Sequence, residues 1–242
     1  MPNNGLFQNQ AAKYNHVDFS ALKLKPDIQL DLNSSLEDSI VLKQNNQDTW
    51  QFLANSSDIY YSRLSDSSNI KFLENELCYN ESKEIQSGIK HSFSMNFGLT
   101  KEDHRYVDIF FAFDKNNRVE PIGFICFSLF LLDSWQVHGI ENGNKGIGLC
   151  CYINYTFVKS SYRQQGIAHH LAKGLAHYFF AQLNHINQQI SSTVLTLTPI
   201  IYRGTYAFGS DFLLKNIQQN IMTFCELRSL YLCPCITNVE AK

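Results

Sequence analysis

The residues from Phe157 to Ala168 combine types that could bind a phosphorylated ligand. The segment reads Phe-Val-Lys-Ser-Ser-Tyr-Arg-Gln-Gln-Gly-Ile-Ala, so an apolar stretch leads through a polar turn into the start of a helical pattern. The first N–H groups of a helix have no partner within the helix and carry a partial positive charge. An anion bound there gains hydrogen bonds and a favourable dipole. Because Gly166 would let a ligand approach the backbone closely, these residues predict a pyrophosphate site.

Two elements must hold this turn in place. Residues 150–158 are rich in aromatic and β-branched side chains, which predicts a largely buried strand. After Gly166, apolar residues recur at spacings of three and four, which places them on one face of a helix of about five turns. The residues on that face are Ile167, Leu171, Leu175, Tyr178, Phe179, Leu183 and Ile186. The turn therefore joins the end of a strand to an amphipathic helix.

The pattern Arg163-x-x-Gly166-x-Ala168, preceded by Val158 and Tyr162, closely resembles the acyl-CoA-binding motif of the GNAT superfamily of N-acyltransferases. A capped crossover in an ordinary α/β domain would show similar residues without binding any ligand. A dinucleotide-binding loop is the weakest interpretation, because the pattern G-x-G-x-x-G is absent.

The resemblance is close over residues 158–171 and extends more loosely over about 105–214. It implies an α/β fold with a mixed sheet, in which a GNAT-like domain of residues 66–242 follows an N-terminal extension of residues 1–65. The extension is either an independent domain or an embellishment of the GNAT-like fold.

The resemblance also implies that acetyl-CoA is the co-substrate and that its acetyl group is transferred to a primary amine. In the family, the pantetheine arm pairs with the backbone of the strand before the motif. The loop amides hold the pyrophosphate, and Arg163 would be an ionic neighbour. Carried over residue by residue, the predicted cofactor-binding residues are Phe157, Val158, Arg163, Gln164, Gln165, Gly166, Ile167 and Ala168.

The groups that move protons are predicted from the same resemblance. Many members of the family use a tyrosine on the helix after the fifth strand to protonate the departing thiolate. This sequence has Phe212 near that position, and the nearest phenols lie upstream, at Tyr202 and Tyr206. We predict Tyr206 as the catalytic acid, while a loop tyrosine that only packs its ring is the alternative. Asp133 and Glu141 are candidate bases near the expected acceptor pocket.

The acceptor stays open among a protein lysine, a peptide N-terminus, a small polyamine and an aminoacyl conjugate. Tyr152 and Asn154, on one side of the predicted strand, are candidates for lining its pocket, with core packing as the alternative for Tyr152. A homodimer also stays open. The alternative function is a non-catalytic acyl-CoA-binding or protein-interaction module on the same fold.

The composition argues against several other classes of function. The chain of 242 residues has 20 Lys and Arg against 22 Asp and Glu, so we expect no broad nucleic-acid-binding surface. The longest apolar run, residues 122–132, is too short to span a bilayer. The polar N-terminus lacks a signal-peptide pattern, and seven cysteines, an odd number, suit a reducing compartment, so a cytoplasmic location is expected. We expect no metal, because Cys233-Pro234-Cys235 lacks a metal-site spacing.

The remaining apolar patterns predict further elements. Strands are expected at 106–113 and 119–132, as a hairpin with its turn at 114–118, and at 193–198, where Pro199 would stop the strand. The strand at 193–198 should lie parallel to the strand before the motif. Helices are expected at 49–64, 70–79, 83–93 and 210–222.

Overall fold

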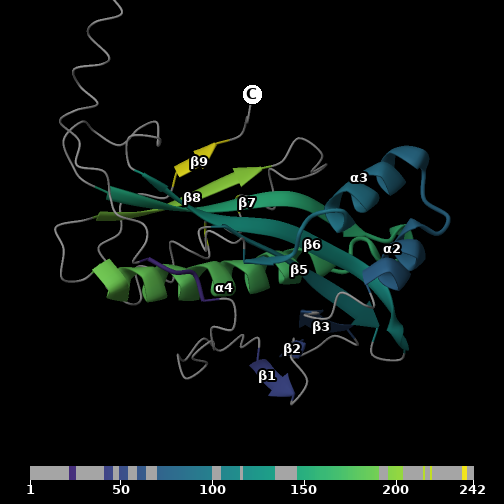
Figure 1. Ribbon diagram of the computed structural model, residues 1–242. Helices are drawn as coiled ribbons and strands as arrows, with labels where there is room; N and C mark the ends of the chain where they lie inside the picture. Colours follow the sequence, from purple (N-terminus) through teal and green to yellow (C-terminus); the bar gives the residue numbers. More distant parts are fainter. Residues whose placement is uncertain are drawn as a thin grey trace, which may run out of the picture.

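The computed structural model describes residues 22–25, 41–45, 49–53, 59–63, 70–99, 105–114, 117–133, 146–190, 196–203, 215, 219 and 236–238. These residues build a mixed β-sheet with helices on both of its faces (Figure 1). The mixed α/β architecture expected from the sequence is confirmed.

The strands of the described residues pair in a single sheet. In spatial order they are β1 (Val41–Asn45), β2 (Thr49–Leu53), β3 (Ile59–Arg63), β5 (Arg105–Asp114), β6 (Asn117–Asp133), β7 (Gly146–Val158), β8 (Thr196–Arg203) and β9 (Ile236–Asn238). The short strand β4 (Gly98–Leu99) pairs with β5 outside this order. Neighbours from β1 to β7 are antiparallel, whereas β7, β8 and β9 are parallel to one another.

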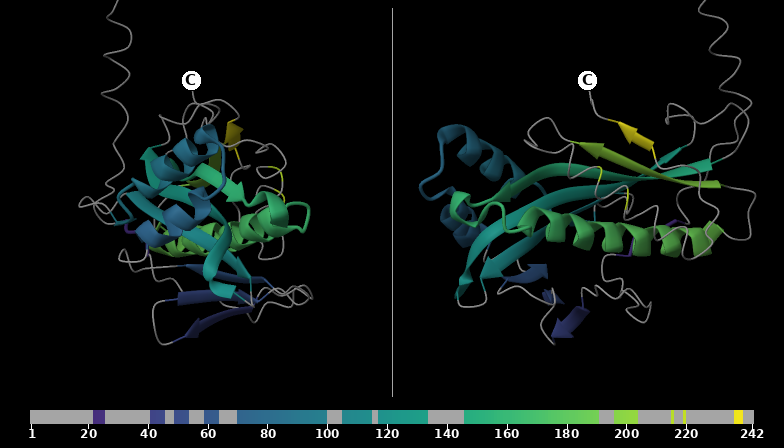
Figure 2. Two further views of the ribbon diagram at one scale, coloured as in Figure 1. Left: turned by 90° about the vertical axis from the view of Figure 1, so that its right-hand side faces the viewer. Right: turned by 180° about the vertical axis from the view of Figure 1, so that it is seen from behind.

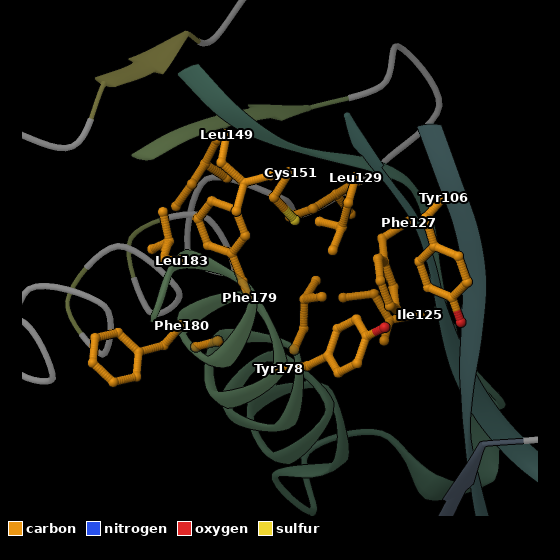
Figure 3. Packing of buried hydrophobic residues seen from close by; sticks show 14 of the residues in the cluster. Tyr106, Ile125, Phe127, Leu129, Leu149, Cys151, Tyr178, Phe179, Phe180 and Leu183 are labelled. Carbon is orange, nitrogen blue, oxygen red and sulfur yellow. The ribbon is translucent and has the colours of Figure 1, made fainter. Parts of the chain in front are cut away.

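Helix α4 (Ile167–Ile190) covers one face of the sheet (Figure 2). Its buried side chains include Tyr178, Phe179 and Leu183, which pack against Phe127, Leu129, Leu149 and Cys151 of the sheet (Figure 3). Large apolar side chains of this kind each contribute roughly 1.5–3 kcal/mol when they leave water. The predicted amphipathic helix is therefore confirmed, and it runs one turn beyond Ile186.

Helices α2 (Ile70–Cys78) and α3 (Lys83–Phe93) lie over the opposite face, at the end of the sheet where β7 finishes (Figure 1). Leu77, Ile89 and Phe93 of these helices pack with Phe124 and Phe157 of the sheet. The Ser82 Oγ begins α3 by accepting a hydrogen bond from the Ile85 N–H at 3.4 Å. Both helices and the β5–β6 hairpin confirm their predicted positions.

The predicted helix over residues 49–64 is wrong, because these residues contribute β2 and β3. Strand β3 pairs with β5, so that Ile59 lies opposite Asp114. The edge of β5 offers unpaired backbone groups, and this stretch supplies aromatic types that favour strands, such as Trp50, Phe52 and Tyr61. Tertiary pairing therefore outweighs the helical pattern. The division between residues 65 and 66 stays a prediction, although β1, β2 and β3 belong to the same sheet as β5.

Pro199 does not stop its strand. It lies inside β8, opposite Leu149 of β7. Proline lacks an N–H and is tolerated where a strand has a neighbour on one side only. Among the described residues that condition holds here, because β9 begins to pair with β8 at Ile200. Residues 193–195 and most of the predicted helix at 210–222 lie outside the described residues.

An N-terminal segment, Leu22–Lys25, lies along α4 and is called the strap below. Leu22 and Leu24 are buried in the core that α4 forms with the sheet. The backbone of the residues that follow each leucine, Lys23 and Lys25, is held by two glutamines of α4. The Gln182 side chain accepts from the Lys25 N–H at 3.1 Å and donates to the Lys25 carbonyl at 2.6 Å. Gln189 does the same for Lys23, at 3.0 and 3.1 Å. Each carboxamide therefore replaces the partner strand that an extended segment needs.

We expect Gln182→Ala to lower the free energy of unfolding by about 1–3 kcal/mol, since the Lys25 N–H and carbonyl lose their partner in a partly buried place. Gln182 is 0% exposed, whereas Gln189 is half-buried and its bonds to Lys23 lie at the surface. Gln189→Ala is the matched control and should cost less, because water can replace its bonds. Urea unfolding of both variants checks this. Equal losses would show that the burial of Gln182 does not matter.

Candidate functional site

A β-bulge interrupts β7 before its end. Tyr155 lies opposite Cys126 of β6 and Ile153 lies opposite Phe127, so Asn154 is an extra residue without an opposite partner. The bulge reverses which face each side chain meets. Before it, Cys151 and Ile153 pack on the α4 face, and after it Val158 does so instead. Tyr155 and Phe157 then face α2 and α3.

Beyond the bulge, β7 has an open edge. Its parallel pairing with β8 ends at the pair Ile153 and Arg203, so in the described part of the chain no strand pairs with the outer edge of residues 154–158. The Lys159 N–H donates to the Ile122 carbonyl of β6 at 2.9 Å. Because backbone groups alternate along an antiparallel strand, Phe157 also turns its N–H and carbonyl toward β6. The backbone groups of Thr156 and Val158 therefore face the open edge.

The side chain of Thr156 carries a buried polar atom that lacks a hydrogen-bond partner among the described residues. This atom is the hydroxyl oxygen, Oγ1. Buried hydroxyl groups are usually paired. Thr156 lies in the part of β7 that has the open edge, so a ligand along that edge could supply the missing partner.

The turn after β7 is a cradle of backbone amides. A short 3-10 helix, η4 (Ser160–Tyr162), follows the strand, and then Gln164 and Gly166 take positive φ angles of 65° and 77°. The first hydrogen bond of α4 runs from the His170 N–H to the Gly166 carbonyl at 3.0 Å. Within the described residues, the N–H groups of residues 164–169 have no hydrogen-bond acceptor. Successive free amides at a helix N-terminus form an anion site.

Two contacts brace this turn against the β5–β6 hairpin. The Tyr162 hydroxyl donates to the Asp114 carboxylate at 3.3 Å, and the Lys159 ammonium pairs with the Glu120 carboxylate. Burial, and then the nearby Asp114 charge, raise the pKa of Tyr162, so its hydroxyl stays a donor at neutral pH. The cradle is therefore held by groups that do not themselves face it.

Arg163 is the cation next to the cradle. Its Nε donates to the Val158 carbonyl at 3.0 Å, which ties the turn to the end of β7. The side chain is exposed, and none of the described carboxylates forms an ion pair with it. The rest of the guanidinium can therefore meet an anion bound at the amides.

The structure gathers the predicted cofactor-binding residues at one end of β7 and α4. Gln164, Gln165 and Gly166 are exposed, whereas the side chain of Ile167 is 2% exposed and can offer only its backbone. Phe157 points into the core of α2 and α3. The predicted catalytic residue, Tyr206, and the candidate base Glu141 lie outside the described residues, and Asp133 is the last residue of β6. Their roles stay predictions.

Sequence reasoning did not find Thr156, because a bulge sets its direction. The only signal was a polar residue, Asn154, inside an aromatic strand. Asn154 is 9% exposed, and its Nδ2 donates to the Ser128 Oγ at 2.9 Å and lies 3.8 Å from the Cys126 Sγ. Burial raises the pKa of Cys126, so this thiol is neutral.

A groove of about 820 Å³ opens on the α2 and α3 face. Its lining residues are Lys71, Glu74, Lys90, Phe93, Ser94, Met95, Asn96 and Phe97. The Met95 sulfur lies 3.9 Å from the Cys126 Sγ, and Cys126 in turn contacts Asn154. One buried side chain therefore separates the wall of the groove from the bulge.

The histidines of α4 do not gather into a metal site. Across the described ranges, no group of three His, Cys, Asp or Glu side chains could hold a metal ion. His177 instead lies half-buried on the helix. Burial, and then the charge of Lys173, lower the pKa of His177 to about 4. The neutral imidazole is therefore the form that the fold accommodates.

The geometry defines a class of protein: an α/β domain in which an open strand edge leads into a helix N-terminus with free backbone amides. Residues 73–193, half of the chain, match the model of the Acetyltransferase (GNAT) family, and the chain belongs to that family. The match spans α2 to α4 and confirms the resemblance seen in the motif. This membership supports a general activity, acyl transfer from acyl-CoA. No curated protein matches the chain.

We expect the stability of the fold to fall in acid partly because of His177. Its pKa is near 6.5 in the unfolded chain and about 4 in the fold. The unfolded state therefore binds a proton first as pH falls, and stability is lost between about pH 6.5 and 4. The loss is at most about 3 kcal/mol. Urea unfolding of His177→Gln and the parent protein over this range should show a smaller loss in the variant. Parallel curves would contradict the prediction.

Proposed function

We propose that the protein transfers an acetyl group from acetyl-CoA to a primary amine. One observation carries the proposal: the free amides of residues 164–169 lie directly after the open edge of β7. The two together suit a ligand that has a pyrophosphate at one end and an extended, amide-containing arm at the other. Acyl-CoA has this form. We choose acetyl as the acyl group because the resemblance to the family implies acetyl-CoA as the co-substrate.

The arm would lie along the open edge of β7. Amide groups of pantetheine can pair with the N–H and carbonyl of Val158, once the Arg163 side chain shares or leaves that carbonyl. The Thr156 N–H, the first on the open edge after the bulge, would then donate to the thioester carbonyl. A donor aimed at that oxygen stabilises the negative charge that develops there during attack.

The reaction needs little from side chains beyond position. The neutral amine attacks the carbonyl carbon, the C–N bond forms, and the C–S bond breaks. The amine nitrogen loses a proton, and the departing thiolate gains one. We assign the second proton to Tyr206. The acceptor would approach on the α2 and α3 face, where the groove beside Cys126 is lined by apolar side chains such as Met95 and by charged ones such as Lys90.

A cytoplasmic setting is part of the proposal. Cys78, Cys126 and Cys150 are free thiols, as expected in a reducing compartment. Throughout the portions of the chain that the structure describes, no helix has the length and apolarity to cross a membrane.

We expect acetyl-CoA and CoA to raise the melting temperature of the protein, because a ligand that binds only the folded state stabilises it. At about 100 times the dissociation constant the gain is about 2.7 kcal/mol, which corresponds to roughly 5–10 °C for a chain of this size. Thermal-shift titration measures it. Gly166→Glu should abolish the shift, because it adds a carboxylate where the anion binds.

Gly166→Ala is the matched control for this variant. A Cβ at Gly166 would lie 3.8 Å from the nearest side-chain atoms, so space is not the obstacle, but the φ of 77° strains any side chain. The alanine variant carries the strain without the charge and should keep part of the shift. An unchanged shift in Gly166→Glu would refute the placement of the pyrophosphate. Ligand binding without amine-dependent thiol release would instead favour the non-catalytic module.

For the proton donor, we expect Tyr206→Phe to lower kcat about 100-fold, the usual size for a general acid, with little change in the KM for acetyl-CoA. Steady-state thiol release from acetyl-CoA with a saturating amine measures both constants. Tyr202→Phe is the control, since Tyr202 lies on β8, half-buried. A full rate in Tyr206→Phe together with a loss in Tyr202→Phe would move the role to Tyr202.

A further inference from the structure

The bulge in β7 is held by side chains as well as by the backbone. The Asn154 Nδ2 donates to the Ser128 Oγ at 2.9 Å and lies 3.8 Å from the Cys126 Sγ. Ser128 and Cys126 flank the point at which the register of β6 and β7 shifts, between Cys126 and Phe127. The carboxamide of the extra residue therefore fastens both sides of the irregularity to β6.

This fastening has an energetic reason. A bulge leaves one residue without a cross-strand partner, and Asn154 replaces the lost pairing with a side-chain hydrogen bond. Ser128 is 0% exposed and Asn154 is 9% exposed, so water cannot easily take over the bond. A buried donor and acceptor that lose each other destabilise the fold, because both have left water without gaining another partner. The bulged register is therefore favoured over a regular one.

The register decides what the open edge presents. If β7 paired with β6 without the bulge, every later residue would shift by one position and turn to the other side. The Thr156 N–H would then face β6, and the Phe157 N–H would face the open edge. The side chains of Phe157 and Val158 would also exchange faces, against the packing of both cores. The direction of the Thr156 N–H thus depends on the bulge.

We propose that Asn154 is a positioning residue: through Ser128 it fixes the bulge of β7 and so aims the Thr156 N–H at the carbonyl of the bound thioester. This inference rests on the proposed function. Asn154 itself does not touch the reacting atoms. Its loss should weaken polarisation of the carbonyl while leaving the pyrophosphate cradle intact, because the free amides of the cradle begin ten residues later in the sequence, at Gln164.

The experiment measures the carbonyl directly. Acetyl-CoA labelled with ¹³C at the acetyl carbonyl is bound to the protein, and its stretching frequency is recorded by isotope-edited infrared spectroscopy. A hydrogen bond from the Thr156 N–H lowers this frequency relative to free acetyl-CoA. Asn154→Ala and Ser128→Ala are compared with the parent protein, alone and combined. Cys150→Ala is the matched control, because Cys150 is buried on the same strand but four residues before the bulge.

We expect both single variants to lose most of the frequency shift and to lower kcat at least tenfold, with the thermal shift by CoA unchanged. The double variant should be no worse than either single variant, since the two residues act through one bond. Cys150→Ala should keep the frequency shift even if it is equally destabilised. A normal frequency shift and kcat in Asn154→Ala would overturn the proposal.

Thiol release and the infrared comparison distinguish a failure of the proposed function from a failure of the role of Asn154. A parent protein that binds acetyl-CoA but releases no thiol with any amine would refute acetyl transfer, and the infrared comparison would still decide the role of Asn154. A parent protein that binds no acetyl-CoA would overturn both proposals. A frequency shift lost equally in Cys150→Ala would assign the effect to general destabilisation and overturn the role of Asn154 alone.

Discussion

One extra residue in β7 sets the arrangement at the functional end of the domain. A strand that alternates regularly would send the same parity of side chains to α4 along its whole length. The extra residue, Asn154, lets the first half of β7 pack toward α4 through Ile153, while the second half packs toward α2 and α3 through Tyr155 and Phe157. The same shift turns the backbone of Thr156 and Val158 away from β6. Core packing and the open edge are therefore fixed together.

The two parts of the site, the N-terminus of α4 and the open edge of β7, would bind a ligand through different interactions. The N-terminus of α4 offers charge complementarity through free amides and Arg163, and it requires little shape. The edge of β7 offers directional hydrogen bonds and requires a defined register. Both are joined by a short turn that is braced to the β5–β6 hairpin by Tyr162 and Lys159. A rigid junction lets one ligand satisfy both demands at once.

The sequence predicts the local part of this design well. The helix of residues 167–190, the hairpin and the amide cradle depend on contacts close in sequence, so periodicity and Gly166 are enough to place them. The bulge depends on the register in which β7 pairs with β6, and the presence of Asn154 alone does not predict it. Likewise, residues 59–63 become a strand because β5 offers them an edge, and residues 49–53 pair with that strand in turn. Pro199 stays in β8 because, among the described residues, β9 pairs beside this strand only from Ile200. Such outcomes are decided by neighbours distant in the chain.

The strap also bears on the order in which the domain can be completed. The Lys25 backbone and the Gln182 side chain that holds it are 157 residues apart in sequence. During synthesis, Leu22 and Leu24 leave the ribosome long before α4 exists to cover them. Contacts of such long range close large loops and form late. The strands from β1 to β7 all lie within that loop. The strap would therefore dock last, and Leu22 and Leu24 would complete the core of a sheet whose central strands had already paired.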